Sequence, residues 1–321
     1  MPQPVTSPRE SQSAGAVLMV RPARFAFNPE TAASNAFQAS DAGREAVAGT
    51  DAIHELALRE FDGVAGGLAG RGVDVIVAED TAVPAKPDAV FPNNWVSFHH
   101  DGSVVLYPMF APNRRLERRE EIVRHVTQTG SYRTSRLVDL SYREEQAKFL
   151  EGTGSLVLDR ANGIAYATLS ARTDLDVLGE FAQQLDYDLV TFESADATGL
   201  PVYHTNVMMA VGTAFAVVCG EAIVDPVRRI AVLDTLRSSG HEVIEISKTQ
   251  MHQFAGNLLE LKGSHGNVIA LSTTAWASFG GGERRSLERH AGIFAADVPV
   301  IERLGGGGVR CMLAEIHLPK R

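Results

Sequence analysis

The stretch DPVRRIAVLDTLRSSGHEVIEI, residues 225–246, contains the pattern that decides the fold. Asp225 and Pro226 are residue types that begin a helix, and Gly240 is one that ends it. Residues 243–246 then follow as a short β-branched strand. Between them, apolar residues recur at helical spacing on one face: Val227, Ile230, Leu233 and Leu236. The stretch predicts an amphipathic helix, a glycine stop and a strand.

The same pattern occurs four more times along the chain. Helical periodicity covers residues 51–70, 116–129, 173–185 and 283–295, with Thr173 as a candidate N-cap. The strands that follow start at Val73, Leu137, Leu189, Val243 and Val298, so successive starts are 52 to 64 residues apart. After four of these strands comes a hairpin signal between apolar runs: Asp101 with Gly102, Asn162 with Gly163, Gly212 with Thr213, and residues 265–267. Each unit is therefore a strand, a hairpin and a helix.

Five such units indicate an α/β fold, a five-bladed pseudo-symmetric propeller of repeated strand-hairpin-helix units. The fifth unit lacks a hairpin partner at the C-terminus, and the apolar residues 17–20 could supply that strand and close the ring. An ordinary α/β sandwich with coincidental spacing is the alternative. Residues 1–14 are rich in Pro, Ser and Gln and are expected to form a disordered leader, so that 15–321 form a single propeller domain.

Composition excludes several classes of protein. The 321 residues are 45% hydrophobic and 21% charged, as in an ordinary globular protein, and the net charge of −9 argues against a nucleic-acid partner. The densest basic run, from Arg114 to Arg119, has glutamates interleaved and is interpreted as a solvated helix face. Without an apolar run of ~20 residues or a secretory pattern, the chain is expected to be cytoplasmic, with no membrane partner.

Metal and disulfide chemistry are not expected either. The two cysteines, Cys219 and Cys311, belong to no CxxC pair, and the ten histidines show no HxxxH spacing. We therefore expect no metal and no cofactor.

The segments that enter the hairpins carry residues unusual for strands. They are Asn93 with Asn94, Glu151 with Gly152, His204 to Asn206, Gly256 with Asn257, and Cys311 after four glycines. In a closed ring, corresponding positions converge on the central axis. Residues far apart in the sequence would then line one pocket.

Cys311 is the candidate nucleophile. Four glycines at 305–308 weaken a strand and require a reason, such as a close approach of backbone to ligand. A free thiol has a pKa of ~8.5 and needs a neighbouring base, for which His204 is the best candidate. The alternative for Cys311 is a small buried hydrophobe, and Cys219, inside an apolar run, is interpreted in that way.

His204 and Glu151 are the candidates for proton transfer. Alternation in residues 202–209 places His204, Asn206 and Met208 on one face of a predicted strand. Glu151 stands between apolar residues and a double-glycine turn, where its carboxylate can orient an imidazole or move protons itself. A core histidine and a turn-exposed glutamate remain the alternatives.

In this order, these residues resemble the arginine deiminase and amidinotransferase (pentein) superfamily, over nearly the whole chain past residue 14. The motifs that carry the resemblance are Phe91 to Asn94, Glu151-Gly152, His204 to Asn206, and the glycine loop ending in Cys311. The resemblance implies a five-bladed α/β propeller with Cys311 as nucleophile and His204 and Glu151 as the proton-handling pair. The chain is most similar to the citrulline-hydrolysing branch.

Two departures from the family pattern bear on the substrate. Asn94 and Asn206 stand where deiminases usually have aspartates that grip a cationic guanidinium. Burying that cation without a carboxylate costs several kcal/mol, whereas asparagine offers the donor and the acceptor that a neutral ureido group needs. Gly154 replaces a further acid. Succinylarginine dihydrolases share an asparagine at a binding position, so the inference is not unique.

The expected function is cysteine-dependent hydrolysis of the ureido carbon of citrulline to ornithine, CO2 and ammonia through an S-carbamoyl intermediate. Asn93, Asn94 and Asn206 are expected at the substrate, and Arg21 and Arg310 are candidates to pair its α-carboxylate. Alternatives are an arginine deiminase, a dimethylarginine dimethylaminohydrolase, a succinylarginine dihydrolase or an amidinotransferase, and, in another class, a non-catalytic propeller that binds a partner. The expected partner is a small amino-acid substrate, with a homodimer left open.

Overall fold

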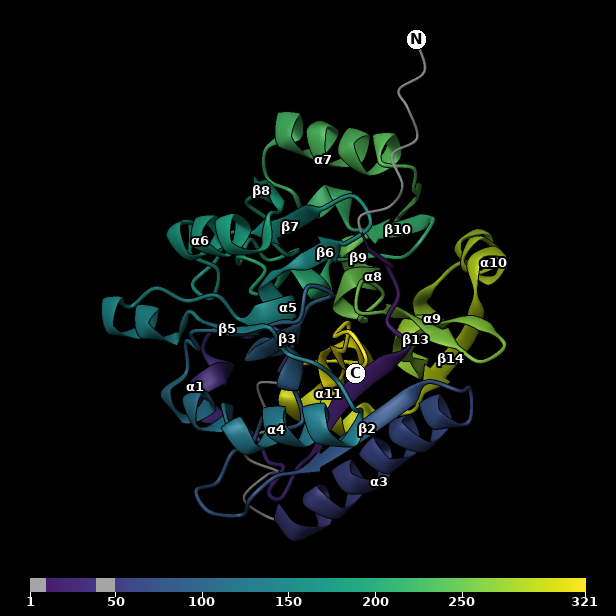
Figure 1. Cartoon of the computed structure of the whole chain (residues 1–321). Helices are drawn as coiled ribbons and strands as arrows, with labels where there is room; N and C mark the ends of the chain where they lie inside the picture. Colours follow the sequence, from purple (N-terminus) through teal and green to yellow (C-terminus); the bar gives the residue numbers. More distant parts are fainter. Residues whose placement is uncertain (1–9, 39–49) are drawn as a thin grey trace.

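The computed structural model describes residues 10–38 and 50–321, and these residues form five three-stranded sheets (Figure 1). In each sheet a central strand pairs antiparallel with one neighbour and parallel with the other. The antiparallel pairs of four sheets are hairpins whose turns lie where the sequence predicts them. The predicted α/β class and its fivefold repeat of one unit are confirmed.

The strands, with the central strand of each sheet in the middle, have the following bounds. They are β15 (Ala314–Glu315), β1 (Ala16–Arg21) and β2 (Asp74–Glu79); β3 (Val96–Phe98), β4 (Ser103–Leu106) and β5 (Arg136–Asp139); β6 (Val157–Asp159), β7 (Ile164–Thr168) and β8 (Asp188–Phe192); β9 (Met209–Val211), β10 (Phe215–Val218) and β11 (Glu242–Glu245); and β12 (Leu259–Gly263), β13 (Gly266–Ser272) and β14 (Gly292–Ala296).

In each sheet one longer helix lies between the central strand and its parallel neighbour, because two parallel strands need a crossover connection. These helices are α3 (Thr50–Ala69), α4 (Glu120–Thr129), α6 (Leu175–Leu185), α7 (Pro226–Ser238) and α10 (Gly281–His290). Figure 1 shows α3, α6, α7 and α10 at the outside of the molecule. Shorter helices are α1 (Pro29–Ala32), α5 (Gly152–Ser155), α8 (Lys248–His252), α9 (Thr273–Ser278) and α11 (Pro299–Gly305), and 3-10 turns are η1 (Pro92–Asn94), η2 (Pro112–Glu117), η3 (Ser141–Gln146), η4 (Thr205–Val207), η5 (Gly220–Ala222) and η6 (Val309–Met312).

The two ends of the chain meet in one sheet. The N-terminal strand β1 pairs antiparallel with β15, with Val17 opposite Glu315 and Leu18 opposite Ala314. The predicted closing strand at residues 17–20 is thus found within β1. The fifth sheet is completed by strands from the two ends of the sequence.

Several predicted elements are wrong in detail. The strand expected at Val298 is the start of α11, because Pro299 at the first helical position favours a helix, and the fifth parallel strand is β14. The strand predicted over residues 202–209 begins only at Met209, as β9, and the residues before it form η4. The turn η6 likewise precedes β15. The N-cap of α6 is Asp174 rather than Thr173.

Residues 10–14, expected in the disordered leader, pack in the structure, while residues 1–9 lie outside the described part of the chain. The Gln12 side chain donates to the carbonyls of Leu158 and Val211 at 2.9 and 3.0 Å and accepts from the Arg160 amide at 2.7 Å. Ser13 donates to Glu260 at 2.6 Å. This segment therefore links the sheets that contain β6, β9 and β12.

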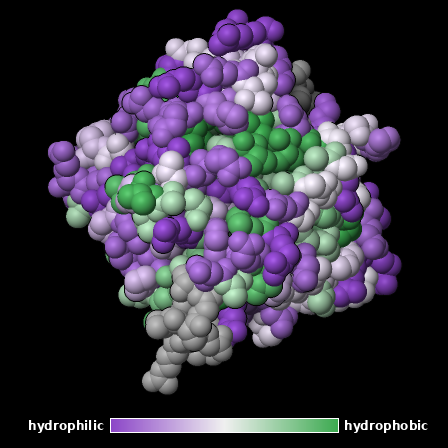
Figure 2. Space-filling view, turned by 90° about the horizontal axis from the view of Figure 1, so that it is seen from below, coloured by the Kyte–Doolittle hydropathy of each residue, from purple (hydrophilic) through white to green (hydrophobic). Residues whose placement is uncertain are grey.

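The face of the molecule seen in Figure 2 is mainly polar. Seen from below, apolar side chains gather in a few areas among polar ones (Figure 2). Of the helices formed by residues 10–38 and 50–321, none combines the length and the apolar character that crossing a membrane requires.

Candidate active site

Short helical turns precede four of the strands that pair antiparallel with a central strand, namely β3, β6, β9 and β15. These turns and the residues next to them carry the predicted site residues. Asn94 ends η1, Glu151 precedes α5, Asn206 lies in η4, and Cys311 lies in η6. The turns η1, η4 and η6 pack through α5 and one another, so these side chains converge. A 3-10 turn aims successive side chains differently from a strand, yet His204 and Asn206 both reach the site.

The converging turns enclose a small buried cavity. Its walls combine ionisable, amide and aromatic side chains with the glycine loop. The lining residues are Thr31, Asn35, Asp88, Phe91, Asn94, Arg114, Arg172, Tyr203, His204, Gly305, Gly306, Gly307 and Cys311.

Cys311 is 4% exposed, and its sulfur accepts two amide hydrogen bonds. Asn257 Nδ2 lies 3.2 Å and Asn206 Nδ2 3.5 Å from Sγ. Burial raises the pKa of the thiol, while the Asn257 and Asn206 amides and the charge of Arg310 oppose that rise. The sulfur is thus a buried thiol surrounded by groups that favour its anion.

His204 and Glu151 form a hydrogen-bonded pair. His204 Nε2 lies 2.8 Å from Glu151 Oε2, and both side chains are buried. Burial opposes ionisation of Glu151, but Arg172, the His204 hydrogen bond and Arg114 together hold the pKa of this carboxyl well below its usual range. An ionised Glu151 can only accept, so His204 Nε2 carries the proton and Nδ1 keeps its lone pair. Burial lowers the pKa of His204 to about 4, although Glu151 opposes this shift, so the imidazole is neutral at pH 7.

Two buried arginines that the sequence did not single out line the cavity. Arg172 Nη1 lies 3.3 Å from Glu151 Oε2, and its Nη2 donates to the Thr31 carbonyl at 3.0 Å. Arg114 makes a two-point ion pair with Glu117 and donates from Nη1 to Asn94 Oδ1 at 2.8 Å. The interpretation of the run around Arg114 as a solvated face is wrong for this residue, because its guanidinium is neutralised by buried acids. No motif in the sequence distinguishes either arginine.

The three predicted asparagines occupy different places. Asn94 lines the cavity, and its Nδ2 is buried without a hydrogen-bond partner. Asn206 is not part of the cavity lining, but it donates to Cys311, which is, and its Oδ1 has no partner. Asn93 is also buried with unpartnered amide atoms, but it is absent from the cavity lining. Asn257, noted in the sequence only as the corresponding position of the fourth unit, joins the site through Cys311.

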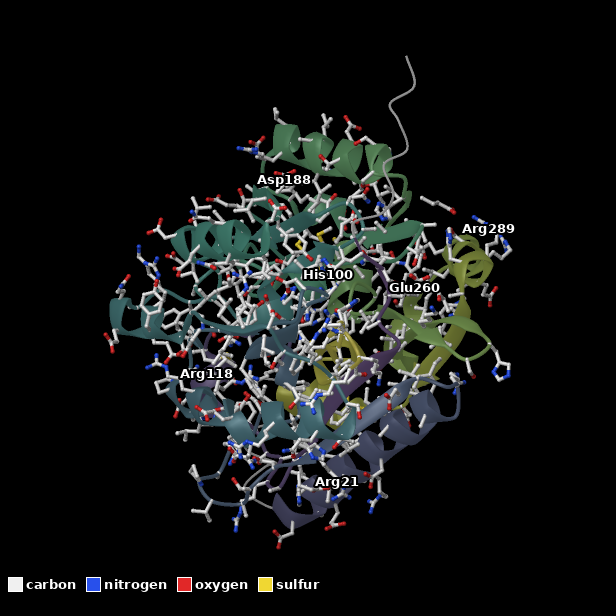
Figure 3. The ribbon with its side chains drawn as sticks, in the orientation of Figure 1. Arg21, His100, Arg118, Asp188, Glu260 and Arg289 are labelled. Carbon is white, nitrogen blue, oxygen red and sulfur yellow. The ribbon has the colours of Figure 1, made fainter. Side chains whose placement is uncertain are left out.

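The two arginines expected at the substrate carboxylate lie elsewhere. Arg21 pairs with Asp62 of α3 through two 2.9 Å hydrogen bonds near the outer edge of the molecule (Figure 3). Arg310 donates to the Leu313 carbonyl at 2.9 Å and to Glu315 at 3.1 Å. Neither lines the cavity.

The glycine run has a steric explanation at two positions. A Cβ on Gly306, whose φ is +65°, would lie 2.4 Å from Asn35 Nδ2, and one on Gly308 would lie 2.7 Å from Asn257 Oδ1. Gly154, in place of the acid expected in the family, is explained in the same way. A Cβ there would lie 2.4 Å from Asn94 Nδ2 and 2.8 Å from His204 Nδ1.

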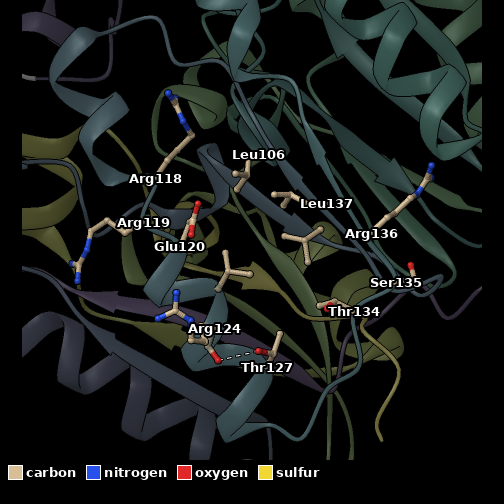
Figure 4. A pocket seen from close by; sticks show the side chains of 12 residues that line it. Leu106, Arg118, Arg119, Glu120, Arg124, Thr127, Thr134, Ser135, Arg136 and Leu137 are labelled. Atoms are coloured by element: carbon tan, nitrogen blue, oxygen red, sulfur yellow. Dashed lines mark hydrogen bonds between the residues drawn. The ribbon is translucent and has the colours of Figure 1, made fainter.

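A roomier pocket lies away from this chemistry, between α4 and the strands β4 and β5 (Figure 4). Its walls are apolar residues such as Leu106 and Leu137, with Arg118, Arg119, Arg124 and Arg136 around them. Its lining contains no cysteine and no histidine, and we place the candidate active site at the Cys311 cavity. Within residues 10–38 and 50–321, no cluster of His, Cys, Asp and Glu is arranged to hold a metal.

Fold and site together define a class: hydrolases that act on C–N bonds other than peptide bonds with a cysteine nucleophile, in the arginine deiminase and amidinotransferase (pentein) superfamily. The resemblance seen in the sequence is confirmed at this level. The chain belongs to the family described as N,N dimethylarginine dimethylhydrolase, eukaryotic, whose profile matches residues 21–318. No curated protein sequence matches the chain.

Solved structures share the fold at low sequence identity. Apo ArgZ, an arginine dihydrolase from the ornithine-ammonia cycle in cyanobacteria, is 16% identical with a TM-score of 0.73, over 95% of this chain and 41% of that chain. The substrate-bound N-terminal domain of ArgZ is 15% identical with a TM-score of 0.71, over 94% and 97%. A dimethylarginine dimethylaminohydrolase adduct with S-methyl-L-thiocitrulline is 15% identical with a TM-score of 0.63, over 94% and 100%. The chain thus spans less than half of full-length ArgZ.

Proposed function

We propose that this protein hydrolyses the ureido carbon of citrulline, giving ornithine, CO2 and ammonia through an S-carbamoyl intermediate on Cys311. The observation that carries the proposal is the pair of asparagine amides, Asn94 and Asn206, beside the nucleophile where a cation-binding site would have carboxylates. We further propose that the five sheets are the blades of a five-bladed propeller arranged around this cavity.

The unpartnered amide atoms match a neutral ureide. Because Asn94 Oδ1 accepts from Arg114, its free Nδ2 is a donor that suits a ureido C=O. Because Asn206 donates to the sulfur, its free Oδ1 is an acceptor that suits a ureido N–H. The carboxylate of Glu151 already accepts from His204, from Arg172 and from the Phe110 amide. Glu151 therefore has little hydrogen-bonding capacity left for a cationic head group.

The arrangement supports a two-step reaction. The neutral His204 takes the thiol proton, the Cys311 thiolate attacks the ureido carbon, and His204 passes that proton to the departing nitrogen, so that ornithine leaves and an S-carbamoyl group remains. A water then attacks the same carbon and gives a proton to His204, and the S–C bond breaks with its electron pair returning to sulfur. His204 returns its proton to the sulfur, which restores the thiol and the neutral imidazole. The released carbamic acid divides into CO2 and ammonia. Glu151 holds the imidazole in the required tautomer.

One observation favours the guanidino alternative. Asp88 lines the cavity, and its Oδ1 is buried without a hydrogen-bond partner. That oxygen could accept from a guanidinium, as in hydrolysis of arginine or a methylated arginine. Burial raises the pKa of Asp88, although Arg114 and Asn28 oppose the rise.

Substrate comparison tests the proposal. Purified protein would be supplied with citrulline, arginine, N-succinylarginine and dimethylarginine. Release of ammonia or dimethylamine, together with formation of ornithine, citrulline or N-succinylornithine, would give kcat/KM for each. We expect citrulline to exceed each guanidine by at least tenfold, and Cys311→Ala to abolish turnover. Turnover of a guanidine without turnover of citrulline would overturn the argument that the two asparagines favour a neutral ureido group.

The non-catalytic alternative has its own test. A propeller that only binds a partner predicts that Cys311 is dispensable and that no S-carbamoyl adduct forms. Mass spectrometry after rapid acid quenching with citrulline should detect a mass increase on the peptide that contains Cys311. Its absence, together with no turnover of any of the four compounds, would favour the binding module.

A further inference from the structure

The buried thiol of Cys311 has no imidazolium beside it to stabilise its anion. Burial lowers the pKa of His204 to about 4 despite the opposing effect of Glu151, so the ring is neutral at pH 7. Burial also raises the pKa of Cys311. A nucleophile in this setting needs a different source of anion stabilisation. The groups in contact with the sulfur therefore decide how readily it ionises.

Asn257 is the better placed of the two amides that contact the sulfur. Its Nδ2 donates to Sγ at 3.2 Å and to the Asn206 carbonyl at 3.0 Å, so both amide hydrogens are used. Its Oδ1 accepts from the Arg310 amide at 3.2 Å. An amide flipped by 180° would lose these three contacts, so the orientation with N–H toward sulfur is fixed.

Asn206 is less constrained. Its Nδ2 lies 3.5 Å from the sulfur, and its Oδ1 has no partner. That free oxygen suits contact with substrate, whereas Asn257 has no polar atom left for one. The two amides therefore have different roles: Asn257 contacts the sulfur with a fixed donor, and Asn206 keeps a free oxygen for the substrate.

Gly308 makes room for the Asn257 side chain, and Gly256 lets the chain before Asn257 pass close to the backbone of Val207. A Cβ on Gly308 would lie 2.7 Å from Asn257 Oδ1, and one on the preceding Gly256 would lie 2.6 Å from the Val207 carbonyl. The side chain of Asn257 is 1% exposed, so water does not compete for its donors. A fixed, dry N–H donor interacts more strongly with an anion than a mobile or hydrated one.

We propose that Asn257 is the thiolate-stabilising residue of this enzyme: its amide holds the Cys311 sulfur as an anion before attack and again when sulfur departs from the covalent intermediate. In that second step water adds to the carbon, His204 takes the water proton, and the S–C electron pair returns to a sulfur that already has its donor. The inference rests on the proposed role of Cys311 as nucleophile. It does not depend on which head group is attacked, because the sulfur leaves as the same anion from either adduct.

Alkylation of Cys311 by iodoacetamide without substrate tests this proposal, with the rate measured from pH 6 to 10. The modified peptide would be counted by mass spectrometry, which separates Cys311 from Cys219. In Asn257→Ala we expect the midpoint of the rate profile to move up by at least one pH unit, so that the rate near neutrality falls about tenfold per unit. The plateau at high pH should be at least as high as in the wild type, since a more basic thiolate is more nucleophilic.

Controls separate this role from a structural one. Asn267→Ala removes an asparagine of the neighbouring strand β13 that bonds Glu260, and it should leave the midpoint in place.

If Asn257→Ala does not fold, two other variants test the proposal. Asn257→Asp keeps the shape but places an acceptor at the sulfur, and Asn206→Ala removes the longer contact without touching Arg310. Both should move the midpoint upward, Asn206→Ala by less. The charged and titratable groups around Cys311 stay the same in Asn257→Ala: Asp88, Arg114, Glu151, Arg172, Tyr203, His204 and Arg310.

An unchanged midpoint in every folded variant would overturn the proposal, as would a rate lowered equally at all pH values. Because no substrate is present, a failure of citrulline turnover leaves this result unaffected.

Discussion

Glu151 is the residue on which the buried charges of the site depend. It accepts from His204 at 2.8 Å and from Arg172 at 3.3 Å, and the Phe110 amide donates to its other oxygen at 3.0 Å. Glu151→Gln keeps the shape but removes the charge that fixes the imidazole tautomer. We expect kcat to fall by roughly 10²-fold or more, and the free energy of unfolding by ~3–5 kcal/mol, because Arg172 stays buried without its carboxylate. The exposed Glu145→Gln should match the wild type in kcat and in urea unfolding; equal behaviour of the two variants would contradict this role.

The depressed pKa of His204 gives a pH dependence with a definite sign. Its ordinary value of 6.5 falls to about 4 in the folded protein, chiefly through burial. Between pH 6.5 and 4 the unfolded chain therefore binds a proton that the folded protein does not, so this contribution to stability is complete above pH 6.5 and is lost as the pH falls.

This pH dependence can be measured by comparing the free energy of unfolding of the wild type with that of a His204→Gln variant. The free energy of unfolding of the wild type minus that of His204→Gln should be larger at pH 7 than at pH 5, by up to ~1.4 kcal/mol per pH unit. Taking the difference removes the opposite effect of Glu117, whose pKa burial raises to about 7 although Arg114 opposes the rise. Chemical unfolding at the two pH values measures the difference, and a constant difference would show that His204 titrates alike in both states.

Gly154 sets the distance between Asn94 and His204. A Cβ at this position would approach Asn94 Nδ2 to 2.4 Å and His204 Nδ1 to 2.8 Å, closer than atoms in contact permit. Gly154→Ala is expected to lower kcat/KM at least 10²-fold, because displacement of a catalytic side chain by about 1 Å has this effect. Gly179→Ala is the matched control, since an exposed Cβ in α6 meets nothing within 4 Å. It should keep full activity and gain ~0.5–1 kcal/mol of stability.

At the scale of single residues, the sequence identifies site residues that are unusual among their neighbours, and it does not identify site residues that are ordinary there. Cys311 after four glycines and Glu151 in an apolar segment contradict their local context, and such contradictions are visible in a single sequence. Arg172 looks like any surface arginine, because Glu151 and Thr31 meet it only through the fold. Arg114 pairs with Glu117 three residues later, a spacing that is also common on exposed helices. Nor does a single sequence indicate that Arg21 and Arg310, the candidates for the substrate carboxylate, lie outside the cavity lining.

The helix α7 shows what periodicity predicts at the scale of an element. Its N-cap Asp225 and its stop near Gly240 are as expected, but Val227 and Ile230, expected on the buried face, are 73% and 60% exposed. The buried stripe is Val232, Leu233 and Leu236, because only the C-terminal half of the helix packs on the sheet. The spacing of apolar residues predicts that a helix forms, while the contact face depends on where the sheet lies.

The N-cap of α7 allows a test at the same scale. Asp225 accepts at 2.8 Å from the amide of Val227, one of the donors left free at the start of a helix. Asp225→Ala should lower the free energy of unfolding by ~1 kcal/mol without changing kcat, since the cap is remote from the cavity. Asp234→Ala in the exposed middle of the helix should have a smaller effect. Urea unfolding of both variants decides, and an equal loss would contradict the capping role.

Short turns are the elements that the sequence does not predict. The segments before β9 and β15 alternate like strands, yet they form η4 and η6. Three residues provide too few positions for a helical period to differ from an alternating one. Tertiary packing of these turns against each other decides the conformation, and these turns carry His204, Asn206 and Cys311.

For the whole molecule, the repeat made the architecture predictable because one pattern occurs five times. The ends of the chain were predictable in part. The closing strand at residues 17–20 is apolar and is found in β1. The segment before it is polar, and polarity was interpreted as disorder. Its side chains are buried because they bond to backbone groups that the sheets leave free near the centre.

The contacts of Gln12 lead to a prediction about the stability of the whole molecule. Its amide donates to Leu158 in β6 and Val211 in β9, and it accepts from the Arg160 amide, so it joins two sheets that lie more than 140 residues further along the chain. Gln12→Ala would leave these three buried backbone groups without partners, at ~1–3 kcal/mol each before water enters. We expect a loss of several kcal/mol in urea unfolding with the cavity and kcat preserved at low temperature. The exposed Ser11→Ala, one residue away, should lose less than ~0.5 kcal/mol. Equal stability of the two variants would mean that the sheets hold together without the N-terminal segment.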